Sequence, residues 1–439
     1  MSSTPNKSLA FIDPGPNLVQ YLTAVGERLG PDYRPVFFAR HPKSRSLLRR
    51  LGHEVHPARR SGKSGWPASI QLDPERLVSR LRKESDRELV RRQDPSFCWL
   101  AGELDRFVTA VRPAALFFWN GSGLAAGIAE QIGRARGIPL LFAENGYLPN
   151  TLQLDPEGVN AFASIGRGMD LDDFRAIGYS ADEVRELDRL LDDYRAGKSP
   201  ARAGPASGRI RPGLGAYLLQ GWIDWWQRER GRPVNRLVPR TLPELPERFV
   251  FFPLQVRSDS QLTVHSPLYG NRLDQAIRDI AQALDQIEPG LRLVVKLHPV
   301  DAKRTDYDPL VRELPQVVWA GGGDVRSILE RCAGVVTVNS TVGIEGMIFG
   351  KPVVTLGNNF YVREGLVHAV RERQDLAPQL ARALREAPDA DSIRAFLRYL
   401  YFHAFVRAHW RDHSPGSLDN LARRMVEMTR AGGVERPGG

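Results

Sequence analysis

Cysteine is scarce in this chain of 439 residues, and its scarcity excludes several classes of protein. The two cysteines, Cys98 and Cys332, lie in unrelated contexts, which rules out a disulfide framework and a cysteine-rich zinc site. No apolar run approaches the roughly 20 residues that a membrane-spanning helix needs. The N-terminal residues lack the apolar core of a secretory signal. We therefore expect a reducing, cytoplasmic protein.

Acidic residues are outnumbered, because 61 Lys and Arg face 51 Asp and Glu and give a net charge of +10. This excess predicts an anionic partner, namely nucleic acid, a nucleotide-activated substrate or an acidic membrane face. No helix-turn-helix, zinc finger or RNA-binding signature is present, so we predict no nucleic-acid partner. Hydrophobic residues make up 42% of the chain, which is typical of globular domains.

The first 165 residues alternate short apolar runs with helical patterns. The runs at 8–13, 35–39, 114–119 and 139–144 predict buried strands, and 121–137 predicts a helix. A pair of helices over about 75–112 is expected to form a lid in this half. Strands that alternate with helices indicate a parallel sheet covered on both faces.

The same alternation returns at Phe249, after a segment with a predicted helix at 180–196 and a linker rich in Pro, Gly and Arg. We therefore predict an α/β protein of the GT-B type, with two Rossmann-like domains facing a central cleft. The predicted divisions are a first domain at 1–165, a helical insertion or linker at 166–246, a nucleotide-sugar domain at 247–370, and C-terminal helices at 371–439 that cross back to the first domain.

Polar residues in the second half stand where predicted parallel strands end, which is where open α/β sheets bind ligands. Lys296 and His298 end one strand, and such a basic pair can neutralise a phosphate or protonate a departing phosphate oxygen. The alternative is a strand-end histidine that only packs.

The segment 334–352 is the strongest local signal. A strand runs into Asn339, Ser340 and Thr341, whose side chains are predicted to cap the next helix and form an anion site. Glu345 follows on the first turn and can accept hydrogen bonds from ribose hydroxyls. An ordinary capped helix is the alternative.

Two further polar clusters are predicted to face the cleft. The loop after Phe249 carries Gln255, Asp259, Gln261 and His265, and the alternative is a plain surface loop. In the first half, polar groups follow two strand ends, and two of them are carboxylates suited to acid, base or nucleophilic chemistry. These residues are Asn120, Glu144, Asp155 and Asn160. The run 155–158 also fits an ordinary β-turn.

No metal site is predicted. Asp170 and Asp172 match a D-x-D pattern, but they precede a helical pattern and are interpreted as an N-cap. His53 and His56 are too few for zinc. No Walker sequence, H-E-x-x-H or G-x-S-x-G elbow occurs.

An aromatic segment within the linker predicts a membrane contact. Trp222, Trp225 and Trp226 share a helical face with leucines, and arginines bracket them, as an interfacial anchor on anionic lipid requires. Packing of this helix against the second domain is the alternative.

Four blocks in this order resemble the bacterial capsule polysaccharide synthesis proteins that act as β-Kdo transferases. They are F-x-E-N-G-x-L-P…D-x-x-G-V-N at 142–160, P-L-Q-x-x-x-D-S-Q…H-S at 253–266, K-x-H-P at 296–299 and N-S-T-x-G-x-E-G…G-K-P at 339–352. The residues before about 120 and the C-terminal helices contribute little to this resemblance.

The resemblance implies a GT-B enzyme that transfers Kdo from CMP-Kdo, with retention, to a phosphatidylglycerol-type lipid or lipid-linked glycan at the inner face of the cytoplasmic membrane. Other capsule synthesis or export proteins are implied as partners, and CMP-Kdo is a substrate, so no cofactor is expected. The residues implied to hold CMP are Lys296, His298, Asn339, Ser340, Thr341 and Glu345.

The resemblance also implies that Asp155, supported by Glu144 and Asn160, faces the sugar. Gln255, Asp259, Gln261 and His265 would line the cleft from the other domain. A retaining reaction can pass through a covalent sugar–carboxylate intermediate. Asp155 is the first candidate for the nucleophile and Asp259 the second. Two alternative functions stay open: a GT-B transferase that uses another CMP- or UDP-sugar, and a non-catalytic capsule assembly or export protein.

Overall fold

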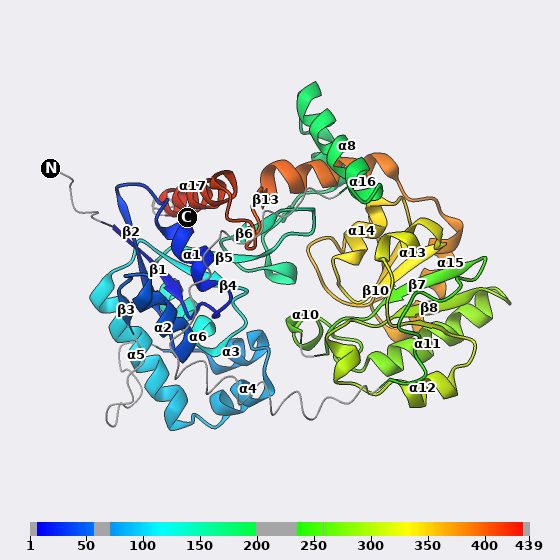
Figure 1. Ribbon diagram of the computed structural model, residues 1–439, viewed down its shortest axis with the longest axis horizontal. Helices are drawn as coiled ribbons and strands as arrows, with labels where there is room; N and C mark the ends of the chain where they lie inside the picture. Colours follow the sequence, from blue (N-terminus) through cyan, green and yellow to red (C-terminus); the bar gives the residue numbers. More distant parts are fainter. Residues whose placement is uncertain (1–6, 57–70, 199–234, 258, 433–439) are drawn as a thin grey trace.

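The computed structural model describes residues 7–56, 71–198, 235–257 and 259–432. Two lobes, each built around a sheet, stand side by side with their strand ends toward a shared boundary (Figure 1). This arrangement confirms the predicted α/β class and its two Rossmann-like domains of the GT-B type. None of the helices in these ranges is long and apolar enough to cross a bilayer.

The first sheet has the strand order β13-β6-β5-β4-β1-β2-β3. Strands β1 to β5 are parallel, whereas β6 pairs antiparallel with both β5 and β13. Its strands are β1 (Lys7–Ile12), β2 (Tyr33–Phe38), β3 (Val55–His56), β4 (Ala115–Trp119), β5 (Leu140–Asn145), β6 (Leu152–Asp155) and β13 (Phe405–Val406).

Helices cover both faces of this sheet. Hydrophobic side chains of α1 (Val19–Gly26), α2 (Pro42–Arg50) and α17 (Pro415–Gly432) pack on one face. Those of α3 (Pro74–Arg80), α4 (Glu84–Arg91), α5 (Pro95–Val111) and α6 (Leu124–Ala135) pack on the other. The predicted two-helix lid is therefore wrong, because three helices occupy 74–111 and α5 is a core layer with Phe97 and Leu104 fully buried.

The second sheet is all parallel, with the order β12-β11-β10-β7-β8-β9. Its residues alternate between two cores: Phe251 and Val294 face one hydrophobic cluster, and Phe252 and Val295 face the other. Its strands are β7 (Phe249–Pro253), β8 (Arg292–Lys296), β9 (Val318–Ala320), β10 (Gly334–Thr337), β11 (Val353–Thr355) and β12 (His368–Ala369).

Most helices after residue 170 pack around the second sheet, including α7 and α8 from the segment predicted as an insertion. Tyr194 near the end of α8 bonds Glu345, and Arg195 bonds the carbonyl of Ile348. The helices are α7 (Leu171–Ala176), α8 (Ala181–Arg195), α10 (Ser260–Thr263), α11 (Leu273–Ile287), α12 (Asp308–Glu313), α13 (Val325–Arg331), α14 (Val342–Ile348), α15 (Leu376–Arg385) and α16 (Ala390–Tyr399).

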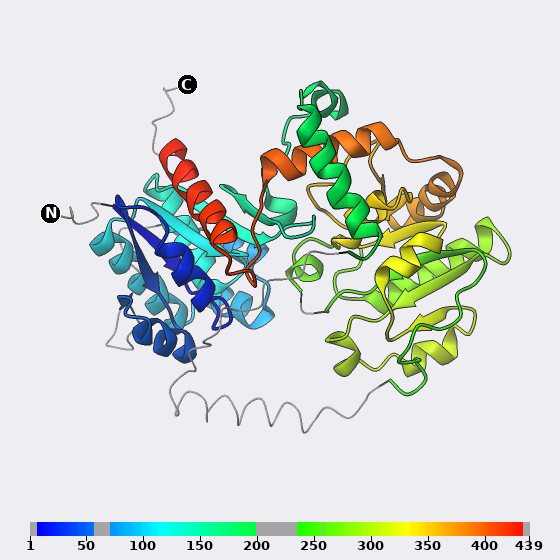
Figure 2. The ribbon, with the colours of Figure 1, turned by 45° about the horizontal axis from the view of Figure 1, so that its top comes forward.

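The C-terminal segment connects the lobes for a second time. After α16, the chain makes the π-helical turn Leu400–Ala404, adds β13 to the edge of the first sheet and ends as α17 against α1 and β5. Figure 2 shows this orange-to-red segment passing from the second lobe onto the first. The two lobes are therefore held together by packing as well as by chain connections.

Candidate active site

A cavity of about 610 Å³ lies between the two sheets. Its walls come from the carboxyl ends of β4 and β5 in the first lobe and of β7, β8 and β10 in the second. Its polar lining residues are Asn120, Glu144, Asn145, Tyr147, Asn160, Gln255, Asp259, Gln261, Lys296, His298, Ser340 and Thr341. Most of the residues predicted from separate strand ends therefore meet in one place.

Glu144 is the carboxyl group on the first-lobe wall. Asn120 holds the left-handed conformation (φ 66°), which asparagine tolerates, and its Nδ2 donates to Glu144 Oε2 at 2.6 Å. The backbone N–H of Asn145 donates to Oε1 at 2.8 Å. Burial raises the pKa of Glu144, an effect that these bonds oppose and that the charge of Asp259 reinforces. Glu144 is thus a fixed group suited to carry a proton.

Lys296 and His298 form the basic part of the second-lobe wall. The backbone N–H of Val300 donates to His298 Nδ1 at 3.2 Å, so the neutral ring carries its proton on Nε2. Burial lowers the pKa of His298, although the charges of Asp301 and Asp259 oppose that shift. Burial also lowers the pKa of Lys296, against the charge of Asp324. An incoming phosphate would raise both values, because it favours the protonated forms.

Ser340 and Thr341 add hydroxyl groups to the same wall. Ser340 Oγ accepts from the N–H of Val342 at 3.3 Å, so Ser340 provides the predicted cap of α14. Thr341 is the N-cap residue but makes no capping bond, and its Oγ1 instead donates to Glu345 Oε1 at 3.2 Å. The two hydroxyls stand in the cavity with Lys296 and His298.

Glu345 does not line the cavity, contrary to its predicted place near the nucleoside. Tyr194 Oη donates to its Oε2 at 2.6 Å, and Thr341 donates to the other oxygen. Burial raises the pKa of Glu345. Both carboxyl oxygens therefore have protein partners, and the residue ties α8 to α14.

Asn339 is likewise outside the cavity, since its side chain is 0% exposed. Its Nδ2 donates to the carbonyl of Gln261 at 2.8 Å, and its Oδ1 accepts from Gln255 Nε2 at 3.1 Å. The predicted contact with CMP is therefore wrong. Asn339 instead fixes the loop that carries Gln255, Asp259 and Gln261 to the end of β10.

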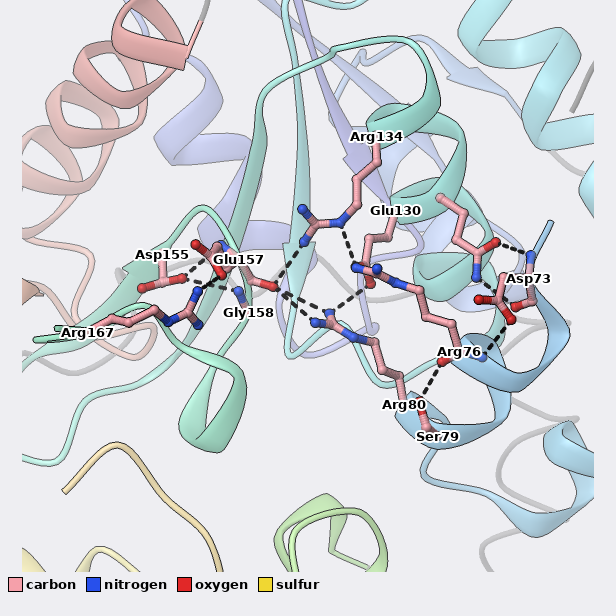
Figure 3. Close-up of polar contacts among 11 residues, drawn as sticks. Asp73, Arg76, Ser79, Arg80, Glu130, Arg134, Asp155, Glu157, Gly158 and Arg167 are labelled. Carbon is pink, nitrogen blue, oxygen red and sulfur yellow. Dashed lines mark hydrogen bonds and ion pairs between the residues drawn. The ribbon is translucent and has the colours of Figure 1, made fainter. Parts of the chain in front are cut away.

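Asp155 does not face the cavity either, which contradicts its placement against the sugar. It is 3% exposed, and its Oδ1 accepts from the N–H groups of Glu157 and Gly158 at 2.8 and 3.1 Å. Its Oδ2 accepts from the N–H and hydroxyl of Ser164 at 2.7 and 2.8 Å. Burial raises its pKa, and these four bonds oppose that shift. Asp155 is the turn residue of the alternative interpretation (Figure 3).

A buried ion cluster supports this turn from the other side. Glu130 is 1% exposed and pairs with Arg76, Arg80 and Arg134, and two of these arginines also reach the carbonyl of Glu157 (Figure 3). Three cations around one buried carboxylate satisfy its charge. The cluster fixes α3, α6 and the β6 turn relative to one another.

His265 lines a separate, narrow cavity of about 10 Å³ together with Arg80 and Phe162. Its ring meets the Phe162 ring edge-on, with the centroids 4.5 Å apart. Burial lowers the pKa of His265 to about 4, and the charge of Arg80 acts in the same direction. His265 thus faces the first lobe across the boundary, but it lies outside the 610 Å³ cavity and its neutral ring packs against Phe162.

Tyr147 is a central residue that the sequence interpretation missed. Its hydroxyl donates to Asn160 Oδ1 at 3.0 Å and accepts from Gln261 Nε2 at 2.6 Å and Asn359 Nδ2 at 2.7 Å. Asn160 belongs to the first lobe, whereas Gln261 and Asn359 belong to the second. The only signal for Tyr147 was its place within the 142–160 block, two residues after Asn145.

Replacement of Tyr147 by Phe should lower the free energy of unfolding by about 1–3 kcal/mol, because three amide groups lose a partner and two of them, those of Asn160 and Asn359, are buried. Urea unfolding followed by circular dichroism measures this change. Tyr33→Phe is the matched control, because it removes a hydroxyl from a buried tyrosine on β2, away from the boundary. Equal losses in both variants would show that Tyr147 does not link the lobes.

The remaining predictions concern the D-x-D pattern at Asp170, metal binding in general and the aromatic segment of the linker. Asp170 caps α7 with a full capping box, as predicted in place of a metal ligand. Within the described ranges no group of three His, Cys, Asp or Glu side chains is arranged to hold a metal ion. Trp222, Trp225 and Trp226 lie outside the described residues.

The topology and the shared cavity define the chain as a GT-B-type protein whose cleft joins an acidic wall to a basic one. Residues 220–410 match the family model of the capsule polysaccharide biosynthesis proteins, in agreement with the resemblance to capsule synthesis proteins found in the sequence.

Individual relatives are distant. Protein FixF of Sinorhizobium fredii is 28% identical over 67% of this chain, and the capsule polysaccharide export protein KpsS of Escherichia coli is 27% identical over 55%. The matched regions span 60% of FixF and 66% of KpsS. The β-Kdo 2,7 transferase KpsC of Thermosulfurimonas dismutans aligns over 74% of this chain and 89% of its own, with 16% identity and a TM-score of 0.43.

Proposed function

We propose that the protein is a retaining β-Kdo glycosyltransferase that moves Kdo from CMP-Kdo to a (lyso)phosphatidylglycerol-type lipid or a lipid-linked Kdo acceptor in capsule linker synthesis. The observation that carries the proposal is the single cavity that brings Glu144 and Asp259 together with Lys296, His298 and the Ser340 and Thr341 hydroxyls. The family resemblance supports the choice of donor. The proposed location is the cytoplasm, peripherally at the inner membrane.

The basic wall suits the CMP end of the donor. Lys296 supplies charge, His298 supplies an Nε2–H donor and Ser340 supplies a hydroxyl donor, all at strand ends of one sheet. The Thr341 hydroxyl also lines the cavity, but its proton is donated to Glu345. A departing monophosphate carries less charge than a diphosphate, so such donors can stabilise it. In this proposal His298 takes up a proton as the phosphate binds, because the phosphate raises its pKa.

The acidic wall suits the sugar. Asp259 becomes the proposed nucleophile, since Asp155 is held within its turn. In the first step an Asp259 oxygen bonds to the anomeric carbon of Kdo, while the bond from that carbon to the phosphate oxygen breaks and CMP leaves with the electron pair. The N–H of Gln261 donates to Asp259 Oδ1 at 3.0 Å and holds the carboxylate in place.

Glu144 is the proposed base of the second step. The acceptor hydroxyl attacks the anomeric carbon, its proton passes to Glu144, and the sugar–Asp259 ester bond breaks. Two inversions at one carbon retain the donor's configuration. The raised pKa of Glu144 matches this role, since a base of higher pKa takes the proton more readily.

Replacement of His298 by Ala should reduce transfer by about 10²-fold, because one donor to the departing phosphate is lost. Turnover with CMP-Kdo, measured by CMP release, tests this expectation. His403→Ala is the matched control, because His403 is exposed and lies outside the cavity. Near-normal turnover of the His298 variant would remove this residue from the phosphate site.

Donor specificity tests the proposal as a whole. The protein is incubated with CMP-Kdo generated in situ and a phosphatidylglycerol mimic, in parallel with CMP-sialic acid and UDP-sugars, and the products are analysed by mass spectrometry. Addition of one or more Kdo residues is expected. Turnover with a different sugar nucleotide but not CMP-Kdo would support another GT-B transferase. Glycan binding without consumption of any donor would support an assembly or export protein.

A further inference from the structure

A second cavity, of about 810 Å³, opens between the lobes. One side is the start of α4 in the first lobe, and the other is formed by Arg257, Thr263, Gly270 and Asn271 of the second. Among the described residues, four cationic side chains and one acidic side chain, that of Glu84, line this cavity. We call it the basic cavity, and its cations are Arg82, Lys83, Arg87 and Arg257. In Figure 1, α3 and α4 of the first lobe face α10 of the second across this boundary.

Two of the four cations have structural partners. Arg87 Nη1 pairs with Glu84 at 3.1 Å, and its Nη2 donates to the carbonyl of Thr263 at 2.7 Å, which links the lobes. The Arg257 guanidinium lies 5.4 Å from the Tyr307 ring centroid and 3.8 Å from Asp274 Oδ1. These contacts fix two sides of the basic cavity.

The other two cations, Arg82 and Lys83, are exposed. Within the described part of the chain, neither Arg82 nor Lys83 forms an ion pair. Glu84, the acidic residue among the described ones that line the cavity, is already shared by Arg87 and Arg91. The basic cavity therefore holds positive charge that is not paired with a carboxylate of the described residues, and such charge attracts an anionic group.

Neighbouring residues of the chain line the basic cavity and the active-site cavity. Arg257 lines the first and Asp259 the second, on one loop. The charge of Arg82 also acts on Glu144, whose pKa it lowers. The positive charge of Arg82 is thus felt at the carboxyl group proposed to take the proton of the acceptor hydroxyl.

We propose that the basic cavity is an acceptor subsite, in which Arg82 and Lys83 bind a phosphate or carboxylate that the acceptor carries beside its attacking hydroxyl. This inference rests on the proposed function for the direction of transfer. Lys296 and His298 are the residues proposed to bind the phosphate of the donor. Arg82 and Lys83 therefore remain to bind the acceptor. Guanidinium and ammonium groups both bind such oxyanions.

Equilibrium binding without any sugar nucleotide tests the subsite. Isothermal titration calorimetry uses two probes: dihexanoylphosphatidylglycerol below its critical micelle concentration, which carries a phosphate diester, and a lipid-free Kdo disaccharide, which carries carboxylates. Lys83→Glu should weaken binding of at least one probe by about tenfold, because attraction becomes repulsion. Added salt should weaken the wild-type interaction.

Arg49→Glu is the matched control, because it makes the same charge change at an exposed residue of α2 outside both cavities. CMP should bind both variants as it binds the wild type. The probe that loses affinity identifies whether the oxyanion comes from a lipid headgroup or a sugar acid. Equal affinities in the two variants, or no binding of either probe, would overturn the subsite. This binding assay contains no sugar-nucleotide donor. Failure of CMP-Kdo transfer in a separate assay would therefore reject the proposed function but would not affect the binding result for the subsite.

Discussion

Replacement of Asp259 by Asn should reduce sugar transfer by about 10⁴-fold or more, because an amide cannot form the proposed ester with the sugar. The substitution preserves size and the acceptor for the Gln261 N–H, so the fold should persist. Single-turnover transfer from CMP-Kdo measures the loss, and the melting temperature checks the fold. A variant that retains transfer within tenfold of the wild type would exclude Asp259 as the nucleophile.

Asp155→Asn is the matched comparison, since both variants neutralise one aspartate. The asparagine has an NH2 group in place of one carboxylate oxygen of Asp155. That NH2 group would face backbone N–H groups that now donate to the carboxylate, so a donor would meet donors. We expect a loss of about 1–3 kcal/mol in the free energy of unfolding, but little change in transfer per folded molecule. If this variant instead remains stable but no longer transfers the sugar, Asp155 would be the nucleophile.

Replacement of Glu144 by Gln should reduce transfer by about 10²–10⁴-fold, through loss of the general base. The single oxygen of the glutamine can accept from either Asn120 Nδ2 or the N–H of Asn145, so a side chain of the same shape keeps one of these two hydrogen bonds. Glu144 must be deprotonated to accept the hydroxyl proton, so wild-type activity should rise with pH through its pKa. Because burial raises that pKa, the rise should occur at higher pH than for an ordinary glutamate.

The pH profile of kcat separates this role from a structural one. The wild type should show an acid limb, and the residual activity of the Glu144 variant should lack it. Asn120→Ala should keep the limb and shift it to higher pH, because a hydrogen bond that lowers the pKa of Glu144 is lost. An unchanged limb in the glutamine variant would assign the proton transfer to another group.

The sequence predicted the fold and most of the cavity because both depend on simple periodic signals. Apolar runs such as 249–253 marked buried strands, and the carboxyl ends of parallel strands meet at one edge of a sheet. This rule placed Glu144, Lys296, His298 and Ser340 in one cavity although they are far apart in the chain.

The same reasoning failed where a polar side chain follows a strand but turns toward the backbone. Asp155, Asn339 and Glu345 each stand near a strand or helix end, and each has its oxygens taken up by protein donors. Residue type and position are alike for a ligand-binding residue and for one that fixes a turn. Only the placement of partners distant in sequence, such as Tyr194 for Glu345, separates them.

The opposite error occurred at Tyr147 and Arg82, which the sequence analysis did not select as candidate residues. The importance of Tyr147 arises from its contacts with Asn359 and Gln261 across the lobe boundary. That of Arg82 arises from the effect of its charge on Glu144, which is distant in sequence but belongs to the same lobe. Such pairings depend on how distant segments are placed in space, which no local pattern encodes.

A crystal structure of the protein with CMP-Kdo tests the central claim most directly. We predict that the phosphate of the nucleotide lies against His298, Lys296 and the Ser340 hydroxyl, and that the anomeric carbon of Kdo faces Asp259 with Glu144 on the acceptor side. A nucleotide bound outside this cavity, or a sugar ring directed away from both carboxyl groups, would contradict the account.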